Sequence, residues 1–165
     1  MIYIAGPFFN EAQVARIRLI EDLCEENRLP YFSPRLRAPV LNSLDEQDRK
    51  KAIKGVFNSN VYGLNNSSVL LADLTDKDTG TIWELGYFFA LSNGRDKKGN
   101  LAIISYSQKA EAVNVMLSRS TYAHISETDE LVRFFSSLGE KSVKLPLYLA
   151  AMSSLPNNSR LETSE

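Results

Sequence analysis

Residues 78–94, DTGTIWELGYFFALSNG, place one carboxylate, that of Glu84, near the start of an otherwise apolar predicted helix. Thr81 and Glu84 have the spacing of a capping box, in which the glutamate accepts a hydrogen bond from a backbone N–H. The same carboxylate is also suited to nucleophilic attack, because the positive end of the helix dipole favours its ionised form. Gly86 costs a helix interior about 1 kcal/mol relative to alanine, which predicts that neighbouring groups pack closely against it. The stretch alone leaves two roles open for Glu84, a helix cap and a nucleophile.

The rest of the sequence narrows the chemistry by what it lacks. It contains neither G-x-G-x-x-G nor G-x-x-x-x-G-K-[ST], which disfavours dinucleotide and triphosphate cradles. No cluster of cysteines and histidines could hold zinc, and the only histidine, His124, is expected to be structural, so we expect no metal and no cofactor. Carboxylates and aromatic rings suit glycosyl chemistry, in which a carboxylate traps an oxocarbenium-like sugar. The candidates are Tyr3, Asp73, Asp76, Asp78, Glu84, Phe8, Phe9 and Trp83.

The composition is that of an ordinary globular domain. The chain has 165 residues, of which 44% are hydrophobic and 24% charged, and its formal net charge is −1. We therefore expect no nucleic-acid or membrane partner. The single cysteine, Cys24, is expected in the core of a protein from a reducing compartment, and we predict a cytoplasmic location. Residues 1–150 are predicted to form one domain, followed by a polar, flexible tail over 151–165.

Strand-like and helical patterns alternate along the chain. This alternation predicts an α/β fold: a single-domain, doubly wound, flavodoxin-like parallel sheet of about five strands flanked by helices. The predicted strands are 1–7, 29–34, 68–74, 100–106 and 121–126, and the predicted helices are 10–27, 44–67, 81–93 and 127–138, with a short helix or loop over 110–120.

Doubly wound sheets bind ligands outside the carboxyl ends of their strands, at the switch in strand order. The candidate site is therefore built from 6–9, 34–37, 73–84 and the residues after Tyr106. Arg35 and Arg37 lie in this region, and we interpret them as solvated loop side chains.

Four separated segments resemble the nucleoside 2-deoxyribosyltransferases, and the resemblance extends from Ile2 to Leu117. The segment DTGTIWELGY is similar to the family signature Asp-x-Gly-x-x-x-Glu-Leu-Gly-Tyr. The four segments are IYIAGPFF (2–9), FNSNVYGL (57–64), DTGTIWELGY (78–87) and NVM (114–116).

The resemblance implies a role for each matching residue. Glu84 is the implied nucleophile, Tyr3 holds it, and Asp78 binds the sugar. Asn114, within the segment that includes Met116, would bind the 5′-hydroxyl in the site of a neighbouring subunit, so the resemblance implies a homo-oligomer of at least two chains. The full predicted site has the catalytic residues Glu84, Tyr3 and Asp78 and the substrate-binding residues Asn60, Asn114, Met116, Gly6, Phe8, Phe9 and Trp83.

Asn60 departs from the family pattern, because many members carry an aspartate there that helps to protonate the leaving base. An asparagine hydrogen-bonds a base edge but delivers no proton at neutral pH. The loop that begins at Arg35 also differs from the base-contacting loop of the family.

The resemblance implies transfer of 2-deoxyribose between free nucleobases through a covalent glutamyl ester, with retention of configuration. The sequence leaves two alternatives. One is a hydrolase of 2′-deoxynucleoside 5′-monophosphates, for which Ser118 and Ser120 could help to hold a phosphate. The other is a non-catalytic nucleotide-sensing module, which would not need Tyr3, Asp78 and Glu84 together.

Overall fold

A computed structural model describes residues 1–39, 45–93, 101–108 and 114–140. Five strands form one sheet in the order β2-β1-β3-β4-β5, and all four neighbouring pairs are parallel. This confirms the predicted α/β fold. The strands are β1 (Ile2–Ala5), β2 (Tyr31–Phe32), β3 (Val69–Asp73), β4 (Ala102–Tyr106) and β5 (Ala123–Ile125).

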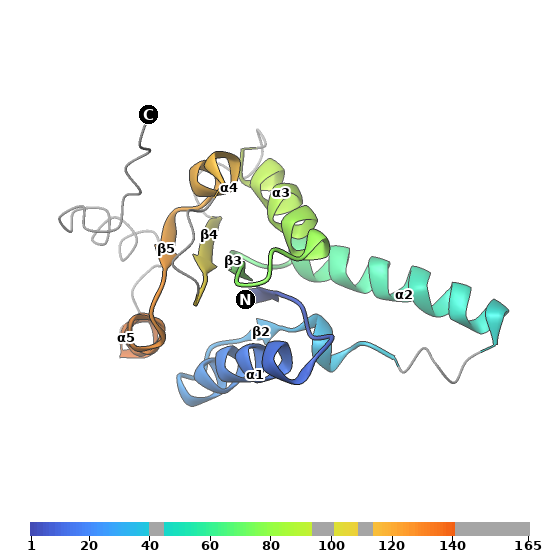
Figure 1. The fold of residues 1–165 in the computed structure, drawn as a ribbon, viewed down its shortest axis with the longest axis horizontal. Helices are drawn as coiled ribbons and strands as arrows, with labels where there is room; N and C mark the ends of the chain where they lie inside the picture. Colours follow the sequence, from blue (N-terminus) through green and yellow to red (C-terminus); the bar gives the residue numbers. More distant parts are fainter. Residues whose placement is uncertain (40–44, 94–100, 109–113, 141–165) are drawn as a thin grey trace.

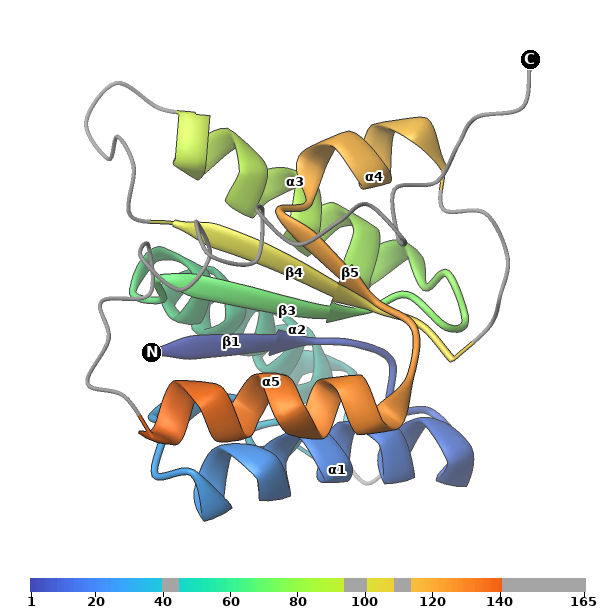
Figure 2. The same ribbon diagram turned by 90° about the vertical axis from the view of Figure 1, so that its left-hand side faces the viewer.

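Helices cover both faces of the sheet. Helices α1 and α5 pack on one face, and α2, α3 and α4 lie on the other (Figures 1 and 2). None of the described helices is long and apolar enough to cross a membrane. The helices are α1 (Glu11–Glu26), the 3-10 helix η1 (Pro34–Leu36), α2 (Glu46–Asn65), α3 (Thr79–Asn93), α4 (Val115–Ser120) and α5 (Thr128–Glu140).

Strands β1, β3 and β4 are buried at every position, as expected of parallel strands covered on both faces. Alternate side chains therefore enter two separate cores. On β1, Ile2 and Ile4 pack towards α1 and α5, whereas Tyr3 and Ala5 pack towards α2 and α3. Cys24 is fully buried in the first core, where burial raises the pKa of its thiol to about 12.

The order of the strands reverses between β1 and β3. The chain passes from β1 outward to β2 and then returns to β3 on the other side of β1. In doubly wound sheets this reversal opens a crevice at the carboxyl ends of the two strands. The segments that follow β1 and β3 therefore border the expected ligand site.

Helix α2 is covered only near its carboxyl end. Among its residues only Gly63 and Leu64 are buried, while Ile53 and Phe57 keep 51% and 55% of their surface exposed. Figure 1 shows the amino-terminal part of α2 extending away from the sheet.

Candidate active site

The site is centred on a hydrogen bond between a strand and a helix. The hydroxyl of Tyr3, on β1, donates to Oε1 of Glu84, on α3, over 2.6 Å. Phe32 of the neighbouring strand stacks on the Tyr3 ring at 5.4 Å. Gly63 makes room for Phe32, because a Cβ at this position would lie 2.7 Å from the ring. Packing from β2 and α2 thus fixes the ring that carries the hydroxyl.

Helix α3 is capped by Asp78, not by Glu84. Oδ2 of Asp78 accepts the Thr81 N–H at 2.8 Å and the Thr81 hydroxyl at 3.0 Å, and the Asp78 carbonyl accepts the N–H of Ile82. The helix accordingly begins at Thr79, before the predicted start. Glu84 then lies beyond the first turn, where its carboxylate bonds side chains instead of the backbone. This geometry contradicts the capping interpretation of Glu84.

Burial raises the pKa of the Glu84 carboxyl to about 7. The hydrogen bond from Tyr3 opposes this rise, and the nearby Asp78 carboxylate adds to it. The pKa of the Tyr3 hydroxyl lies well above its ordinary value, chiefly because the hydroxyl is buried and also because it faces Glu84. Tyr3 therefore keeps its proton, and donates this hydrogen bond, at neutral pH.

Asn60 lies on α2, opposite Glu84. Its side-chain amide donates a long hydrogen bond of 3.5 Å to Oε1 of Glu84, the same oxygen that Tyr3 bonds. The Trp83 ring packs against other aromatic rings. Its centre lies 5.3 Å from that of Tyr87, on which it stacks, and 5.7 Å from that of Phe57. The facing sides of α2 and α3 thus meet through Asn60 and Glu84 and through aromatic rings.

The turn after β1 is closely packed at its start. A Cβ at Gly6 would lie 2.5 Å from Ile17 Cδ1 and 3.1 Å from Asp73 Cβ, so glycine lets β1 end against α1 and β3. Phe8 and Phe9 stack on one another at 5.6 Å. Both line an open groove of about 830 Å³ along the outer side of α1, and neither Tyr3 nor Glu84 lines this groove. Phe8 therefore stacks on Phe9, whereas Trp83 contacts Tyr87 and Phe57.

Asn114 and Met116 begin α4 and are exposed. Oδ1 of Asn114 accepts the N–H of Met116 at 2.9 Å, which caps the helix. Figure 2 shows α4 beginning at the edge of the sheet where β3 and β4 end. Met116 exposes 72% of its surface.

Two expectations about loop and helix residues were wrong. Arg35 is not a solvated side chain, because it forms an ion pair with Glu21, whose side chain is only 5% exposed. Arg37 is exposed, but its guanidinium lies 4.8 Å from the centre of the Phe32 ring. An added Cβ at Gly86 would meet nothing within 4 Å, so no described group packs closely against this glycine. The partners of these two arginines, the Glu21 carboxylate and the Phe32 ring, lie on α1 and β2, which a loop sequence does not show.

A cluster of polar side chains that no sequence motif indicates lies at the end of β3. Arg16 pairs with both Asp73 and Asp76, and Gln13 reaches Asp76 as well. The position of the two aspartates after a buried strand pointed to this edge, whereas nothing in the pattern of α1 indicated Arg16.

Within the part of the chain that the structure describes, no three His, Cys, Asp or Glu side chains are grouped as metal ligands. His124 instead bonds Ser105 at 2.9 Å, and burial lowers its pKa.

The sequence model of the nucleoside 2-deoxyribosyltransferases matches residues 2–128, which is more than half of the chain. The chain belongs to this family. No curated protein matches it. Among solved structures, the chain is similar to the 2-deoxyribosyltransferase of Bacillus psychrosaccharolyticus, with 25% identity and a TM-score of 0.59, over 79% of this chain and 89% of the other. A conserved protein from Enterococcus faecalis V583 shares the fold at 16% identity, with a TM-score of 0.62 over 83% and 97% of the two chains.

The family supports nucleoside 2-deoxyribosyltransferase activity for this chain. The matched range includes every residue of the predicted site. Of these, Tyr3, Asn60 and Glu84 meet in hydrogen bonds, and Asp78 caps the helix that carries Glu84.

Proposed function

We propose that this deoxyribosyltransferase works by double displacement with Glu84 as its nucleophile. A carboxylate oxygen of Glu84 forms a bond to C1′ of a 2′-deoxynucleoside while the C1′–N bond breaks and its electron pair leaves with the base. A ring nitrogen of a second base then attacks C1′ and gives up its proton to solvent, while the ester bond breaks to restore the carboxylate. Two inversions give net retention. The observation that carries this proposal is the 2.6 Å hydrogen bond from Tyr3 to Glu84.

Tyr3 fixes which oxygen attacks. Both hydrogen bonds of the carboxylate, from Tyr3 and from Asn60, go to Oε1. We assign the attack to Oε2, whose lone pairs these bonds do not use. A carboxylate held by a rigid, buried ring loses little freedom on reaching the attacking geometry, which lowers the entropic part of the barrier.

In this proposal Asp78 binds the sugar of the substrate and Asn60 contacts its base. The cap of α3 uses only Oδ2 of Asp78, so Oδ1 is the oxygen that we assign to a sugar hydroxyl. Asn60 offers an amide to the leaving base from the opposite helix but cannot protonate it. The proton on the leaving base must therefore come from another group or from solvent.

We propose further that the active unit is a homo-oligomer in which Asn114 and Met116 enter the site of a neighbouring subunit. The helices on one face of the sheet expose apolar side chains that water disfavours, which supports a partner surface there. These side chains are Ile53, Phe57 and Tyr62 of α2, Trp83 and Phe89 of α3, and Val115 and Met116 of α4.

Mixed oligomers test the sharing of sites. Glu84→Gln and Asn114→Ala chains, each of which we expect to be inactive alone, are unfolded together and refolded. A mixed dimer then contains one site with both native residues, so about a quarter of wild-type activity returns at random assortment if each site uses residues from two chains. Refolding each variant alone is the control. No recovery in a verified mixed oligomer would contradict shared sites.

The reaction itself is tested by incubating the protein with thymidine and adenine and separating the products by chromatography. Transfer yields deoxyadenosine and thymine in equal amounts. Free deoxyribose without deoxyadenosine would show hydrolysis, and unchanged substrates would contradict both the transfer and the hydrolysis of this deoxynucleoside. In a second experiment, wild-type protein is incubated with thymidine alone, quenched and digested. Mass spectrometry should then reveal a deoxyribosyl group on the peptide that contains Glu84.

The alternative hydrolase of 5′-monophosphates has less support. The hydroxyls of Ser118 and Ser120 donate to carbonyls of their own short helix, those of Val115 and Met116. The N–H of Phe9, a donor that could meet a phosphate after β1, is taken by Oε1 of Gln13 at 2.9 Å. These contacts leave the turn after β1 and the α4 serines poorly suited to a dianion.

A further inference from the structure

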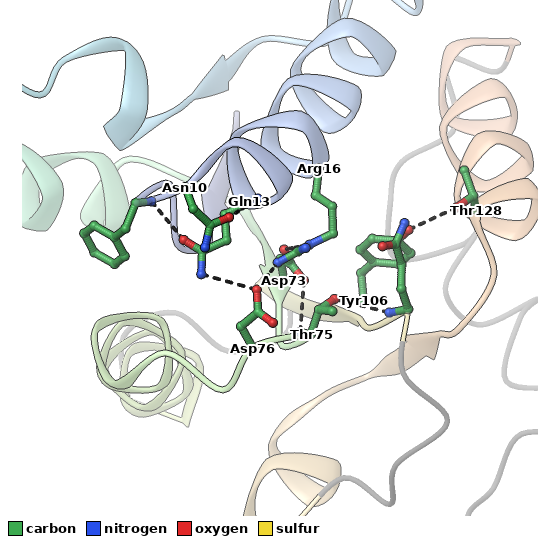
Figure 3. A network of polar contacts seen from close by, with 10 residues as sticks. Asn10, Gln13, Arg16, Asp73, Thr75, Asp76, Tyr106 and Thr128 are labelled. Atoms are coloured by element: carbon green, nitrogen blue, oxygen red, sulfur yellow. Dashed lines mark hydrogen bonds and ion pairs between the residues drawn. The ribbon is translucent and has the colours of Figure 1, made fainter.

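The end of β3 carries a fully buried carboxylate, that of Asp73. Its Oδ1 accepts the N–H of Thr75 at 3.0 Å, which shapes the first turn of the following segment. Its Oδ2 accepts Nε of Arg16 at 2.8 Å, from the second turn of α1 (Figure 3). A buried carboxylate requires such partners, because an uncompensated charge in the interior is very costly.

Arg16 also bonds Asp76, three residues further along the same segment. Its side chain is only 10% exposed, so the two bonds hold the guanidinium between the two carboxylates. Gln13 stands one turn before Arg16, and its amide donates to Asp76 at 3.3 Å while its oxygen accepts the N–H of Phe9. One helix thereby joins the segment after β1 to the segment after β3.

The segment after β4 joins the same network (Figure 3). The hydroxyl of Thr75 accepts the N–H of Gln108 at 3.2 Å, and the N–H of Leu74 donates to the carbonyl of Tyr106 at 2.8 Å. The residues that follow β1, β3 and β4 are therefore tied together at the edge where the site lies.

We propose that Arg16 is a positioning residue for the transferase site, acting through Asp73 and Asp76 on Asp78. This inference rests on the proposed function for its effect on catalysis. Asp78 follows Asp76 after a single residue, Lys77, and it both caps α3 and belongs to the proposed sugar site. Fixing Asp76 thus fixes the start of the helix that carries Glu84.

The segment needs support from outside because its own backbone is strained. Lys77 has a φ of 51°, in the left-handed region that side chains other than glycine rarely adopt. Such a residue keeps its conformation only when its surroundings determine it. Without Arg16, Asp73 and Asp76 would lose the cation between them and repel one another, and the hydrogen bond from Gln13 to Asp76 would be the remaining side-chain contact named here between the segment and α1.

The first test measures order in the segment without reference to activity. Amide hydrogen exchange is followed by mass spectrometry on peptides that cover 74–82, in wild type and in Arg16→Gln and Arg16→Lys. We expect exchange there to rise at least about tenfold in Arg16→Gln, with a smaller rise in Arg16→Lys, and exchange in α5 to stay unchanged. Arg18→Gln, which removes the same charge from an exposed position of the same helix, is the matched control.

The second test measures catalysis in a double-mutant cycle. If Arg16 acts through Asp78, Arg16→Gln lowers kcat/KM for thymidine and adenine at least about tenfold in wild type but less than about twofold in Asp78→Asn. A general loss of stability would lower activity by the same factor in both backgrounds. Should Arg16→Gln fail to fold, Arg16→Gln/Asp73→Asn removes the unpaired buried charge and still deprives Asp76 of its ion pair with Arg16.

The outcomes separate this inference from the proposed function. The inference is supported if amide exchange over 74–82 is faster in Arg16→Gln and if the effects of Arg16→Gln and Asp78→Asn on kcat/KM are not additive. Unchanged exchange over 74–82, or additive losses, overturns it. A wild-type protein without transfer overturns the proposed function, whereas the exchange result still decides whether Arg16 holds the segment.

Discussion

The hydroxyl of Tyr3 donates a 2.6 Å hydrogen bond to Oε1 of Glu84, although 81 positions of sequence separate the two residues. The pairing follows from the sheet, in which Tyr3 lies opposite Leu70 of β3, the strand that leads into α3. A buried donor thus meets a carboxylate whose pKa is raised to about 7. The carboxylate therefore changes its charge near neutral pH, which makes its role measurable.

Removing the charge of Glu84 should abolish transfer. We expect Glu84→Gln to lower kcat at least about a thousandfold, because an amide cannot form the glycosyl ester. The rate of exchange between thymidine and adenine measures the loss, and circular dichroism checks that the fold persists. Transfer near the wild-type rate in this variant would exclude Glu84 as the nucleophile.

The pH profile should report the titration of Glu84. Attack requires the ionised form, so kcat/KM should rise with pH to a plateau, with a midpoint at about 7. The Asp78 charge raises the pKa of Glu84 and the Tyr3 hydrogen bond lowers it. The midpoint should therefore move down in Asp78→Asn and up in Tyr3→Phe, as measured on their residual activity. Identical midpoints in all three proteins would contradict the electrostatic argument.

The same titration predicts an effect on stability. The Glu84 carboxyl binds its proton more tightly in the folded protein, where its pKa is about 7, than in the unfolded chain, where it is near the ordinary 4.5. Stability from this group is therefore full at low pH and is lost as pH rises through 7. At pH 8, Glu84→Gln should be more stable than wild type by about 3 kcal/mol, a rise in Tm of at least about 6 °C.

At pH 4.5 this stabilisation should largely vanish. Glu26→Gln, which changes an exposed glutamate at the end of α1, is the control and should shift Tm little at either pH. A Tm below that of wild type for Glu84→Gln at pH 8 would mean that the ionised carboxylate stabilises the fold instead of destabilising it.

Asn60 predicts selectivity for the leaving base. Because its amide lies 3.5 Å from Glu84 and supplies no proton, Asn60→Asp should favour the nucleosides whose bases need protonation to leave. We expect their kcat/KM to rise relative to the other nucleosides, with a falling limb at high pH. A uniform change across all bases would place Asn60 away from the leaving group.

Deoxynucleosides should be preferred over their 5′-monophosphates. The N–H of Phe9 and the hydroxyls of Ser118 and Ser120 are used internally, so these groups would leave a buried phosphate dianion short of partners, at a cost of several kcal/mol. We expect a preference of at least about a hundredfold in kcat/KM, equivalent to about 2.7 kcal/mol. Assays of thymidine and thymidine 5′-monophosphate side by side measure it, and Asn114→Ser should narrow the gap. A preference for the monophosphate would favour the hydrolase.

The sequence predicted the fold well because its strands are short, apolar and regularly spaced between helices. Tyr3 and Glu84 could be singled out because each lies in a segment that resembles a motif of the family, and their hydrogen bond shows that the fold brings the two side chains together. The role of Glu84 was ambiguous because Thr81 and Glu84 satisfy the spacing of a capping box. Asp78 begins the helix earlier and moves Glu84 past the first turn.

Long-range ion pairs could not be predicted. Arg16 and Asp73 are 57 positions apart, and no local pattern distinguishes this arginine from the exposed Arg18. Arg35 was misjudged for the same reason, because its partner Glu21 is buried on another element. Such pairs depend on how α1 lies across the sheet, and only the folded chain shows that.

The single tryptophan of the chain, Trp83, precedes Glu84 on α3 and stacks on Tyr87 with 48% of its surface exposed. Indole emission from this protein therefore arises at one point of known position. An associating subunit that covers the exposed ring would shift the emission to shorter wavelength, whereas dilution to separate chains would reverse the shift. The protein thus contains its own optical probe next to Glu84, the proposed nucleophile, and the proposed assembly can be tested without an added label.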